Sequence, residues 1–368
     1  MERGRIVGII GGGQLGRMLA LAGMPLGFRF RFLEPSSDPA ARGLGEVVMA
    51  PYDDPTGVEA FSRGLSVVTY EFENVPVETA RRLGRNLPVD PVPGALEMAQ
   101  DRLAEKEGFR RMGIGTAPYR AVDSLEGLRE ALEEVGFPAV LKTRRFGYDG
   151  KGQEVLEGQG DVEAAWERLG DRPLILEGFV PFLRELSVLA VRGRDGDVRC
   201  YPLVENDHRD GILWKSRAPA PKVTPEREEA ARDIAVRVLE GLDYVGVLAV
   251  ELFETEEGLL ANEMAPRVHN SGHWTQDGAV TSQFENHIRA VTGLPLGSVE
   301  PRGASAMVNL LGTIPDLGKL LELPGVHLHL YDKEPRAGRK LGHVNVTVAD
   351  EGDLEGLLEQ VLKVVGEP

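Results

Sequence analysis

The stretch RIVGIIGGGQLGRM, residues 5–18, decides the fold of the amino-terminal part of the chain. Its apolar run Arg5–Ile10 predicts a strand, the glycines that follow predict a tight turn, and Met18, Leu19 and Ala22 recur at helical spacing. A strand, a turn and a helix in this order are typical of a βα unit. We therefore expect a parallel sheet in this part of the chain.

Three further apolar runs follow, at Phe28–Leu33, Glu46–Met49 and Leu65–Thr69, and they alternate with helical or loop stretches. This alternation is expected for a parallel sheet built from βα units. Prolines and a glycine interrupt the chain between residues 88 and 94, which indicates a domain boundary. The sequence thus predicts a small α/β domain over residues 1–95.

The whole chain has 368 residues, 42% of them apolar, which is enough for two or three domains with buried cores. Its 42 basic and 58 acidic residues give a net charge of −16, which disfavours nucleic acid as a partner because the polyphosphate backbone would be repelled. No uncharged apolar stretch approaches the roughly 18–20 residues of a membrane helix. The single Cys200 excludes an internal disulfide, and we expect a soluble cytoplasmic protein without a membrane partner.

A second series of helices and strands fills the middle of the chain. Capping residues and glycine stops delimit its helices, as in the segment from Ser124 to Gly136. A strand, a hairpin and a closing helix are expected from about Gly303 onward. The other expected elements are the helices Leu96–Met112, Val162–Leu169, Thr224–Gly241 and Leu354–Val365, and the strands Phe137–Lys142, Leu174–Leu176, Leu186–Val191 and Tyr244–Phe253.

Gly11, Gly13 and Gly16, with Glu34 about twenty residues further on, fit the fingerprint of a dinucleotide-binding turn. Taken alone, this fingerprint predicts an NAD-dependent dehydrogenase. Glycines and the free N–H groups at a helix start bind any phosphate ester, so the motif indicates a phosphate more firmly than a dinucleotide. A tight turn without a ligand is the structural alternative.

A glycine-rich basic loop is expected at Thr143–Gln153, directly after the strand that ends at Lys142. It carries Arg144, Arg145 and Lys151 among three glycines. Cations and exposed N–H groups on a mobile segment suit a triphosphate, although a solvated surface loop is the alternative. The sequence lacks the pattern G-x-x-x-x-G-K-[ST], which excludes a P-loop nucleotide fold at the level of motifs.

Two acidic residues are expected to face each other on neighbouring strands. Glu251 lies in a buried apolar strand, and a hairpin centred on residue 257 would place Glu263 opposite it, with Cβ atoms about 4.5–5.5 Å apart. Facing carboxylates repel each other unless a cation lies between them, and oxygen ligands of this kind hold Mg²⁺. One exposed acid and one buried, protonated acid form the alternative, which Arg267, four residues beyond Glu263, makes weaker.

His269 and His273 are four residues apart, but a proline before them and a glycine between them predict a loop rather than a zinc-binding helix. Without a third ligand, contact with substrate or phosphate is the better interpretation. His327 and His329 alternate along a predicted strand, and we expect them at the surface or at an interface. The sequence offers no context for a nucleophilic serine or cysteine, so we expect no covalent catalysis by the protein.

Together these motifs resemble the ATP-grasp superfamily and, within it, the ATP-dependent carboxylases that act on 5-aminoimidazole ribonucleotide in de novo purine biosynthesis. Each motif alone is modest evidence, whereas their order and spacing over nearly the whole chain are specific. The motifs are Gly11–Met18, Tyr70–Val75, Gln100–Leu103 with Lys106, Leu141–Gln153, Arg184–Ser187, Ala265–Trp274 and Gly338–His343.

The resemblance implies an ATP-grasp architecture of the α/β and α+β classes. Its parts would be a Rossmann-like parallel-sheet domain over residues 1–95, an ATP-grasp domain over 96–300 with a mobile lid at about 115–178, and a small carboxy-terminal domain over 301–368. The implied activity is that of a carbon–nitrogen ligase, which converts 5-aminoimidazole ribonucleotide, bicarbonate and ATP into N5-carboxyaminoimidazole ribonucleotide, ADP and phosphate through carboxyphosphate. ATP with Mg²⁺ or Mn²⁺ would be the cofactors, and a homodimer the assembly.

The resemblance also implies roles for individual residues on the ATP side. Lys106 and Lys142 would hold the phosphates, and the loop with Gly147, Gly150 and Gly152 would close over them as a lid. Glu251 and Glu263 would bind the metal ion. The remaining ATP-binding residues would be Glu177 with Phe179 and Val180 at the adenine, Glu185 at the ribose, and His208.

On the acceptor side, the resemblance places bicarbonate at Arg267, near the γ-phosphate. Asp149 would orient or deprotonate the amine. Further residues implied around the imidazole and bicarbonate are Tyr148, Lys151 and His269. Glu73 would accept the ribose hydroxyls. The 5′-phosphate would be held by Lys333, Arg339 and Lys340, with the turn residues Gly13, Gln14 and Leu15 nearby.

Two positions depart from this pattern, and alternatives stay open. Ala265 stands where many members of the superfamily carry an asparagine, which leaves a third metal ligand in doubt, and Glu34 has no role. Another ATP-grasp ligase, such as a formate-dependent nucleotide transformylase or a peptide-like ligase, is the first alternative. A dehydrogenase and a nucleotide sensor without turnover are the others, and a dehydrogenase leaves Lys142 and the acid pair unexplained.

Overall fold

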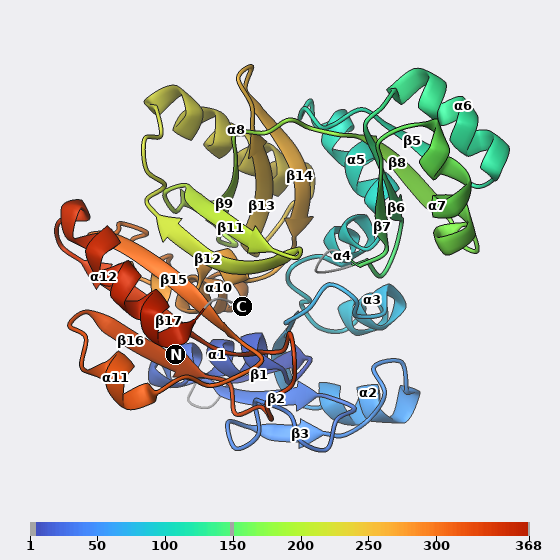
Figure 1. Cartoon of the computed structure of the whole chain (residues 1–368). Helices are drawn as coiled ribbons and strands as arrows, with labels where there is room; N and C mark the ends of the chain where they lie inside the picture. Colours follow the sequence, from blue (N-terminus) through green and yellow to red (C-terminus); the bar gives the residue numbers. More distant parts are fainter. Residues whose placement is uncertain (1–4, 148–150, 367–368) are drawn as a thin grey trace.

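The computed structural model describes residues 5–147 and 151–366, and it arranges them in three sheets (Figure 1). A parallel sheet of four strands lies at the bottom of the view, and a second four-stranded sheet stands apart at the upper right. The third sheet is antiparallel and has nine strands. None of the helices within these residues combines the length and the apolar content needed to span a bilayer.

The amino-terminal sheet is parallel and has the strand order β3-β2-β1-β4. Its strands fall on the predicted apolar runs, which confirms the parallel sheet expected from the sequence. Burial on both faces explains why the central strand β1 is a continuous apolar run. The strands are β1 (Ile6–Ile10), β2 (Arg29–Leu33), β3 (Glu46–Val48) and β4 (Leu65–Tyr70), and the helices are α1 (Gln14–Gly23), η1 (Met24–Leu26), α2 (Pro55–Ser62) and α3 (Val77–Gly84).

The single helix expected over Leu96–Met112 is wrong, because the chain forms two helices, α4 (Pro93–Ala99) and α5 (Arg102–Arg111). The Asp101 carboxylate accepts hydrogen bonds from the N–H groups of Leu103 at 3.0 Å and Ala104 at 3.3 Å. An aspartate that satisfies these N–H groups favours a new helix start over a continuous helix. The break makes α5 a separate helix, which carries Arg102 and Lys106.

The small sheet is antiparallel and has the strand order β5-β8-β6-β7. Helix α6 begins at the predicted cap, since the Ser124 side chain accepts a hydrogen bond from the Gly127 N–H, and it ends at Gly136 as expected. The basic loop connects β6 to β7, which places Lys142 opposite Gln153. The elements are β5 (Tyr119–Val122), α6 (Leu125–Val135), β6 (Ala139–Thr143), β7 (Gln153–Leu156), η2 (Gln159–Asp161), α7 (Val162–Leu169) and β8 (Leu174–Gly178).

The large sheet has the strand order β14-β13-β9-β11-β12-β15-β17-β16, with β10 paired to β9. The pairing of β12 with β15 joins the carboxy-terminal strands to the strands of the middle of the chain. The strands are β9 (Arg184–Arg192), β10 (Val198–Cys200), β11 (Val204–Arg209), β12 (Ile212–Ala218), β13 (Gly246–Glu254), β14 (Leu259–Ala265), β15 (Ala304–Leu311), β16 (Val326–Leu330) and β17 (Lys340–Val348). The accompanying helices are α8 (Pro225–Gly241), η3 (Asn270–Gly272), α9 (Thr275–Gly278), α10 (Gln283–Thr292), α11 (Leu317–Leu321) and α12 (Glu351–Val365).

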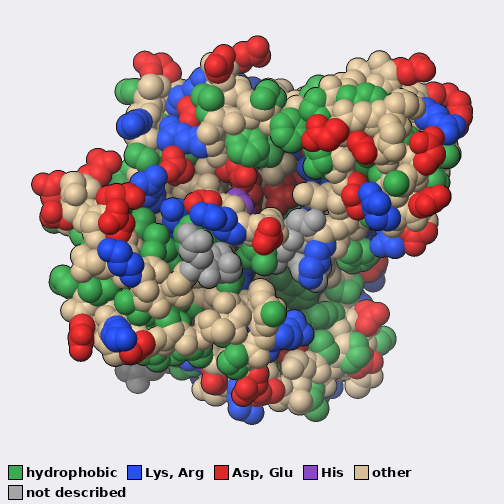
Figure 2. All heavy atoms as spheres, viewed as in Figure 1, with side chains coloured by type: hydrophobic (Ala, Val, Ile, Leu, Met, Phe, Trp, Pro, Cys, Tyr) green, Lys and Arg blue, Asp and Glu red, His purple; other side chains and the backbone are tan. Residues whose placement is uncertain are grey.

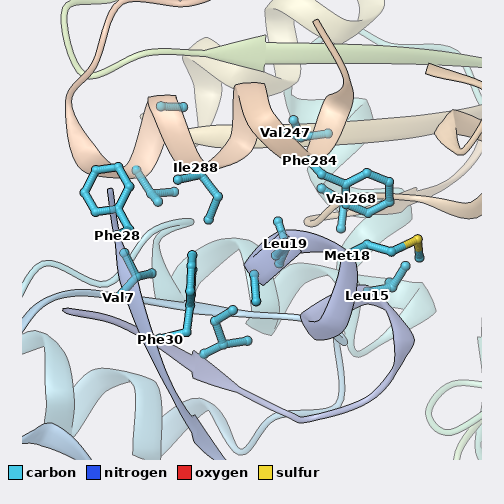
Figure 3. Close-up of a cluster of buried hydrophobic side chains, with 14 of the residues drawn as sticks. Val7, Leu15, Met18, Leu19, Phe28, Phe30, Val247, Val268, Phe284 and Ile288 are labelled. Atoms are coloured by element: carbon cyan, nitrogen blue, oxygen red, sulfur yellow. The ribbon is translucent and has the colours of Figure 1, made fainter. Parts of the chain in front are cut away.

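One apolar core joins the amino-terminal sheet to the large sheet. Leu19 and Met18 of α1 pack with Phe284 and Ile288 of α10, and Val247 of β13 belongs to the same cluster (Figure 3). These side chains are almost fully buried, so the two sheets share a core through the helices between them. This core fixes the glycine turn at the start of α1 relative to the large sheet.

Replacing Leu19 by alanine tests this shared core. Because Leu19 is fully buried, Leu19→Ala is expected to lower the free energy of unfolding by about 2–5 kcal/mol. Leu21→Ala, on the exposed side of the same helix, should change it by no more than about 0.5 kcal/mol. Urea unfolding of both variants measures the difference, and equal effects would contradict the packing described.

Candidate active site

A cavity of about 600 Å³ opens where the three sheets meet. Figure 2 shows acidic and histidine side chains at the hollow between the large sheet and the small-sheet unit. Most of the residues predicted from the sequence line this cavity. They are Gln14, Leu15, Glu73, Lys142, Gly147, Glu177, Phe179, Val180, Glu185, His208, Glu251, Glu263, Arg267, His269 and Lys340.

Other predicted residues lie elsewhere. Gly13, Lys106, Lys151, Gly152, Lys333 and Arg339 are not in the cavity wall, although Lys106 lies directly behind it. Lys333 and Arg339 line a second cavity of about 470 Å³ instead, between the amino-terminal sheet and the segment that joins β16 to β17. Tyr148, Asp149 and Gly150 lie outside the described residues, so their predicted roles stay predictions.

A buried carboxylate neutralises the two lysines predicted to hold phosphates. Glu177 on β8 lies 3.0 Å from the ammonium group of Lys142 and 3.3 Å from that of Lys106, measured from its Oε2 atom. Lys106 also donates a hydrogen bond to the backbone oxygen of Asn262 at 2.7 Å. Burial alone would raise the pKa of Glu177, but the two lysines lower it to about 2. Lys106, Lys142 and Glu177 therefore form a cluster of two positive charges and one negative charge, with a net charge of +1.

The predicted carboxylate pair is confirmed, since Glu251 on β13 is directly opposite Glu263 on β14. The Mg²⁺ expected between them stays a prediction, and Arg267, four residues beyond Glu263, binds neither carboxylate of the pair. Instead, His269 Nε2 lies 3.2 Å from Glu251, and Arg102 donates a hydrogen bond of 2.9 Å to Glu263. Burial would raise the pKa of Glu251, whereas the hydrogen bond and charge of His269 lower it to about 2.

Arg267 contacts the amino-terminal sheet instead. Its Nε atom donates a hydrogen bond of 2.5 Å to Glu73, which follows β4. Partial burial would raise the pKa of the half-buried Glu73, but the charge and hydrogen bond of Arg267 lower it. Across the cleft, His208 Nδ1 lies 2.6 Å from Glu185. Each predicted acidic ligand in the cleft thus already lies beside a basic side chain of the protein.

The glycine turn does not offer its N–H groups to a phosphate as the sequence suggested. The Gly12 N–H donates to Glu34 at 2.8 Å, and those of Gly13 and Gly16 donate to the two oxygens of Glu71. A pyrophosphate at this turn would meet two carboxylates in the place where it needs donors. The dehydrogenase hypothesis thereby loses its binding site, and Glu34 gains a role as an acceptor of hydrogen bonds.

As predicted, His269 and His273 do not lie on one regular helix. The His269 side chain caps the three-residue helix η3, and His273 follows η3 in a turn, where it is buried. His329 is partly exposed; its Nε2 lies 2.8 Å from Asp277, and its ring stacks on His343 with centroids 4.6 Å apart. His327 is half exposed, as expected. Within the described residues no three potential ligands cluster as a metal site would require.

The sequence reasoning missed three residues at this site. Arg102, Glu71 and Glu105 all stand in or beside stretches that carry the family resemblance, yet no role was assigned to them. Glu105 is buried and accepts a hydrogen bond from the Met264 N–H at 2.7 Å, and burial raises its pKa to about 8. Acidic and basic residues at helix starts and strand ends are common, so local sequence gives no signal of these long-range partners.

Comparisons with known proteins bear on the whole chain. A model of the ATP-grasp domain matches residues 107–284, one of the ribonucleotide synthetase preATP-grasp domain matches residues 5–100, and one of the phosphoribosylaminoimidazole carboxylase C-terminal domain matches residues 305–356. The chain is 50% identical over 355 residues to an N5-carboxyaminoimidazole ribonucleotide synthase of Pseudomonas aeruginosa, covering 96% of this chain and 98% of the relative. The chain belongs to the N5-carboxyaminoimidazole ribonucleotide synthase family.

Solved structures of this synthase family have the same fold. The N5-carboxyaminoimidazole ribonucleotide synthetase of Thermus thermophilus superposes with a TM-score of 0.95 at 55% identity, covering 98% of this chain and 99% of that one. The synthase of Aspergillus clavatus in complex with ADP and 5-aminoimidazole ribonucleotide gives 0.92 at 31% identity, covering 99% of both chains. The ATP-grasp architecture with its amino-terminal parallel sheet is therefore confirmed.

The lowered pKa of the buried Glu177 makes the free energy of unfolding depend on pH. A carboxylate with a lowered pKa stabilises the folded state above its ordinary pKa of 4.5, and this contribution is lost as the pH falls toward about 2. The full contribution is about 3 kcal/mol at about 1.4 kcal/mol per pH unit. We expect wild type to exceed Glu177→Gln in free energy of unfolding at pH 6, with a gap that narrows between pH 4.5 and 3. Denaturant unfolding at each pH measures this difference between wild type and Glu177→Gln. A difference that does not change with pH would contradict the lowered pKa of Glu177.

Proposed function

We propose that the chain catalyses the ATP-dependent carboxylation of 5-aminoimidazole ribonucleotide to N5-carboxyaminoimidazole ribonucleotide. The observation that carries this proposal is a single cleft lined by Lys142, the facing carboxylates and residues of the amino-terminal glycine turn, with Lys106 directly behind its wall. Those groups suit a triphosphate, a divalent cation and a second nucleotide at one place. Relatives of the same synthase family, one of them in complex with ADP and 5-aminoimidazole ribonucleotide, support the assignment of the substrate.

ATP would bind between the small sheet and the large sheet. Lys106 and Lys142 would release the carboxylate of Glu177 and bind phosphate oxygens of ATP instead, because the triphosphate carries more negative charge than a single carboxylate. The second oxygen of Glu177, Oε1, is buried without a hydrogen-bond partner among the described residues, so it can accept from the exocyclic amine of adenine. Glu185 with His208 lies in the same cavity, where the ribose would be held.

The metal site would be Glu251 and Glu263. Their carboxylates face each other across the hairpin, and the same cavity wall holds Asn262, whose Oδ1 is buried without a partner among the described residues. Hard oxygen ligands of this kind fit Mg²⁺ or Mn²⁺, in keeping with the chemistry expected of the pair. When bound, the ion would neutralise charge on the ATP phosphates.

The reaction would proceed in two transfers. A bicarbonate oxygen attacks the γ-phosphorus, the bond to the β-phosphate oxygen breaks, and ADP and carboxyphosphate result. The exocyclic amine of the acceptor then takes the carboxyl carbon, phosphate leaves and the amine gives up a proton. Arg267 would hold bicarbonate, with His269 and Lys151 nearby, and Asp149 would orient or deprotonate the amine. Their cationic members stabilise the charge that develops on the transferred group.

The acceptor would lie against the amino-terminal sheet. Glu73 and the turn residues Gln14 and Leu15 line the same cavity as Arg267, so the acceptor amine and bicarbonate can meet there. Lys333 reaches this wall from the carboxy-terminal part, because its ammonium group donates a hydrogen bond to Gln14 Oε1. We assign the 5′-phosphate to Lys333 and Lys340, with Arg339 in the adjoining cavity.

Phosphate release tests the substrate assignment. Release from MgATP is expected to need both bicarbonate and 5-aminoimidazole ribonucleotide, and N5-carboxyaminoimidazole ribonucleotide should accumulate with it. If ATP is consumed with formate and another ribonucleotide instead, the chain is a transformylase. If ATP is never consumed, the chain is a nucleotide sensor.

Neutralising one metal carboxylate tests the ion site. Glu263→Gln is expected to lower the rate of phosphate release at least about 100-fold, because charge on the phosphates is no longer neutralised. Glu257→Gln removes an exposed carboxylate from the tip of the same hairpin and should keep the wild-type rate. Equal rates for Glu263→Gln and wild type over a Mg²⁺ titration would show that the ion binds elsewhere.

We also propose the domain limits 1–95, 96–300 and 301–368, with residues 115–178 as a mobile lid, and a cytoplasmic homodimer. The small-sheet unit, residues 119–178, supports the lid because its sheet is separate from the other two. Family resemblance supports the homodimer and the compartment. Sedimentation equilibrium at micromolar concentration tests the dimer.

A further inference from the structure

The glycine turn is held by a buried carboxylate. Glu71, the residue after β4, accepts a hydrogen bond from the Gly16 N–H at 2.7 Å, and its other oxygen accepts one from the Gly13 N–H. Only 8% of this residue is exposed. A helix start attracts negative charge through its unpaired N–H groups, and Glu71 is the anion that takes this place at α1.

The glycines of the turn are required by this side chain. A Cβ at Gly11 would overlap the Glu71 side chain, and a Cβ at Gly13 would overlap its carboxylate. Gly11 also has a φ of +102°, which side chains rarely adopt. The pattern that resembles a dinucleotide fingerprint therefore accommodates a carboxylate of the chain itself.

Glu71 also faces the acceptor side of the cleft. It lines the main cavity together with Gln14, the first residue of α1. Gln14 accepts a hydrogen bond from Lys333, which lies on the segment between β16 and β17. Burial lowers the pKa of Lys333, and the negative charge of Glu71 opposes this shift, so the carboxylate helps to keep the ammonium group charged.

We propose that Glu71 is a positioning residue for the acceptor nucleotide. It holds the glycine turn through two N–H groups, and its negative charge favours the ammonium form of Lys333, so that Gln14 and Lys333 stand ready for the acceptor. It acts through these groups rather than on the reacting atoms. The same carboxylate occupies the place of a pyrophosphate, which restricts this wall of the cleft to a mononucleotide. The inference rests on the proposed function.

The Glu71→Gln variant removes the negative charge of the side chain while it keeps the size and shape of the side chain. The glutamine carbonyl oxygen can accept from one of the two N–H groups, while its NH₂ group meets the other donor without forming a bond. Aspartate keeps the charge but is one methylene shorter. Glu34 offers a matched control, because it holds the same turn from the other side through the Gly12 N–H and Tyr52 and does not line the cavity.

Steady-state kinetics of Glu71→Gln, Glu71→Asp and Glu34→Gln test the proposal. We expect Glu71→Gln to raise KM for 5-aminoimidazole ribonucleotide at least tenfold while KM for MgATP stays within twofold. Glu71→Asp should recover part of the loss because it restores the charge. Glu34→Gln should lower the melting temperature about as much as Glu71→Gln but leave the acceptor KM within twofold.

Three results would overturn the proposal. The first is an acceptor KM that is unchanged in Glu71→Gln. The second is a rise in Glu71→Gln of KM for MgATP that matches the rise of KM for the acceptor. The third is an acceptor KM that rises as much in Glu34→Gln as in Glu71→Gln, because that would indicate a purely structural role for Glu71. If Glu71→Gln does not fold, Glu71→Asp carries the test, and an acceptor KM within twofold of wild type there also overturns it. Wild type without acceptor-dependent phosphate release would instead refute the proposed function, and this inference with it.

Discussion

The cleft depends on the contact of Glu177 with Lys106 and Lys142. Two buried ammonium groups would repel each other and would lose their hydration, so neither could stay charged alone. The carboxylate at 3.0 and 3.3 Å compensates one of the two charges and joins α5, β6 and β8 at one point. The remaining positive charge leaves the site attractive to a phosphate.

The same arrangement recurs around the cleft. Arg102 pairs with Glu263, His269 with Glu251, His208 with Glu185 and Arg267 with Glu73. The proposed binding of nucleotide and ion would therefore replace existing partners of these side chains rather than supply partners to unpaired ones. A short-lived carboxyphosphate would require water to be excluded from the cleft while it forms.

Sequence reasoning reached the parts of the molecule that local patterns determine. The strand runs of the amino-terminal sheet, the cap at Ser124 and the opposition of Glu251 and Glu263 follow from periodicity and turn position, which act over a few residues. The break at Asp101 was missed because the apolar and charged pattern continues through it. The partner of Glu263 was also missed, since Arg102 is 161 residues away and only the packing of α5 on β14 brings them together. The occupied glycine turn shows the same limit, because its motif is identical whether a phosphate or Glu71 fills it.

The central claim is that bicarbonate and the γ-phosphate of ATP react with each other in this cleft before the acceptor is carboxylated. Transfer of isotope tests it most directly. With bicarbonate labelled with ¹⁸O, a route through carboxyphosphate places one labelled oxygen in each released phosphate, which mass spectrometry or ³¹P spectroscopy detects. Phosphate without label, formed together with carboxylated ribonucleotide, would contradict the account, because the γ-phosphate would then have been transferred to water or to the acceptor instead.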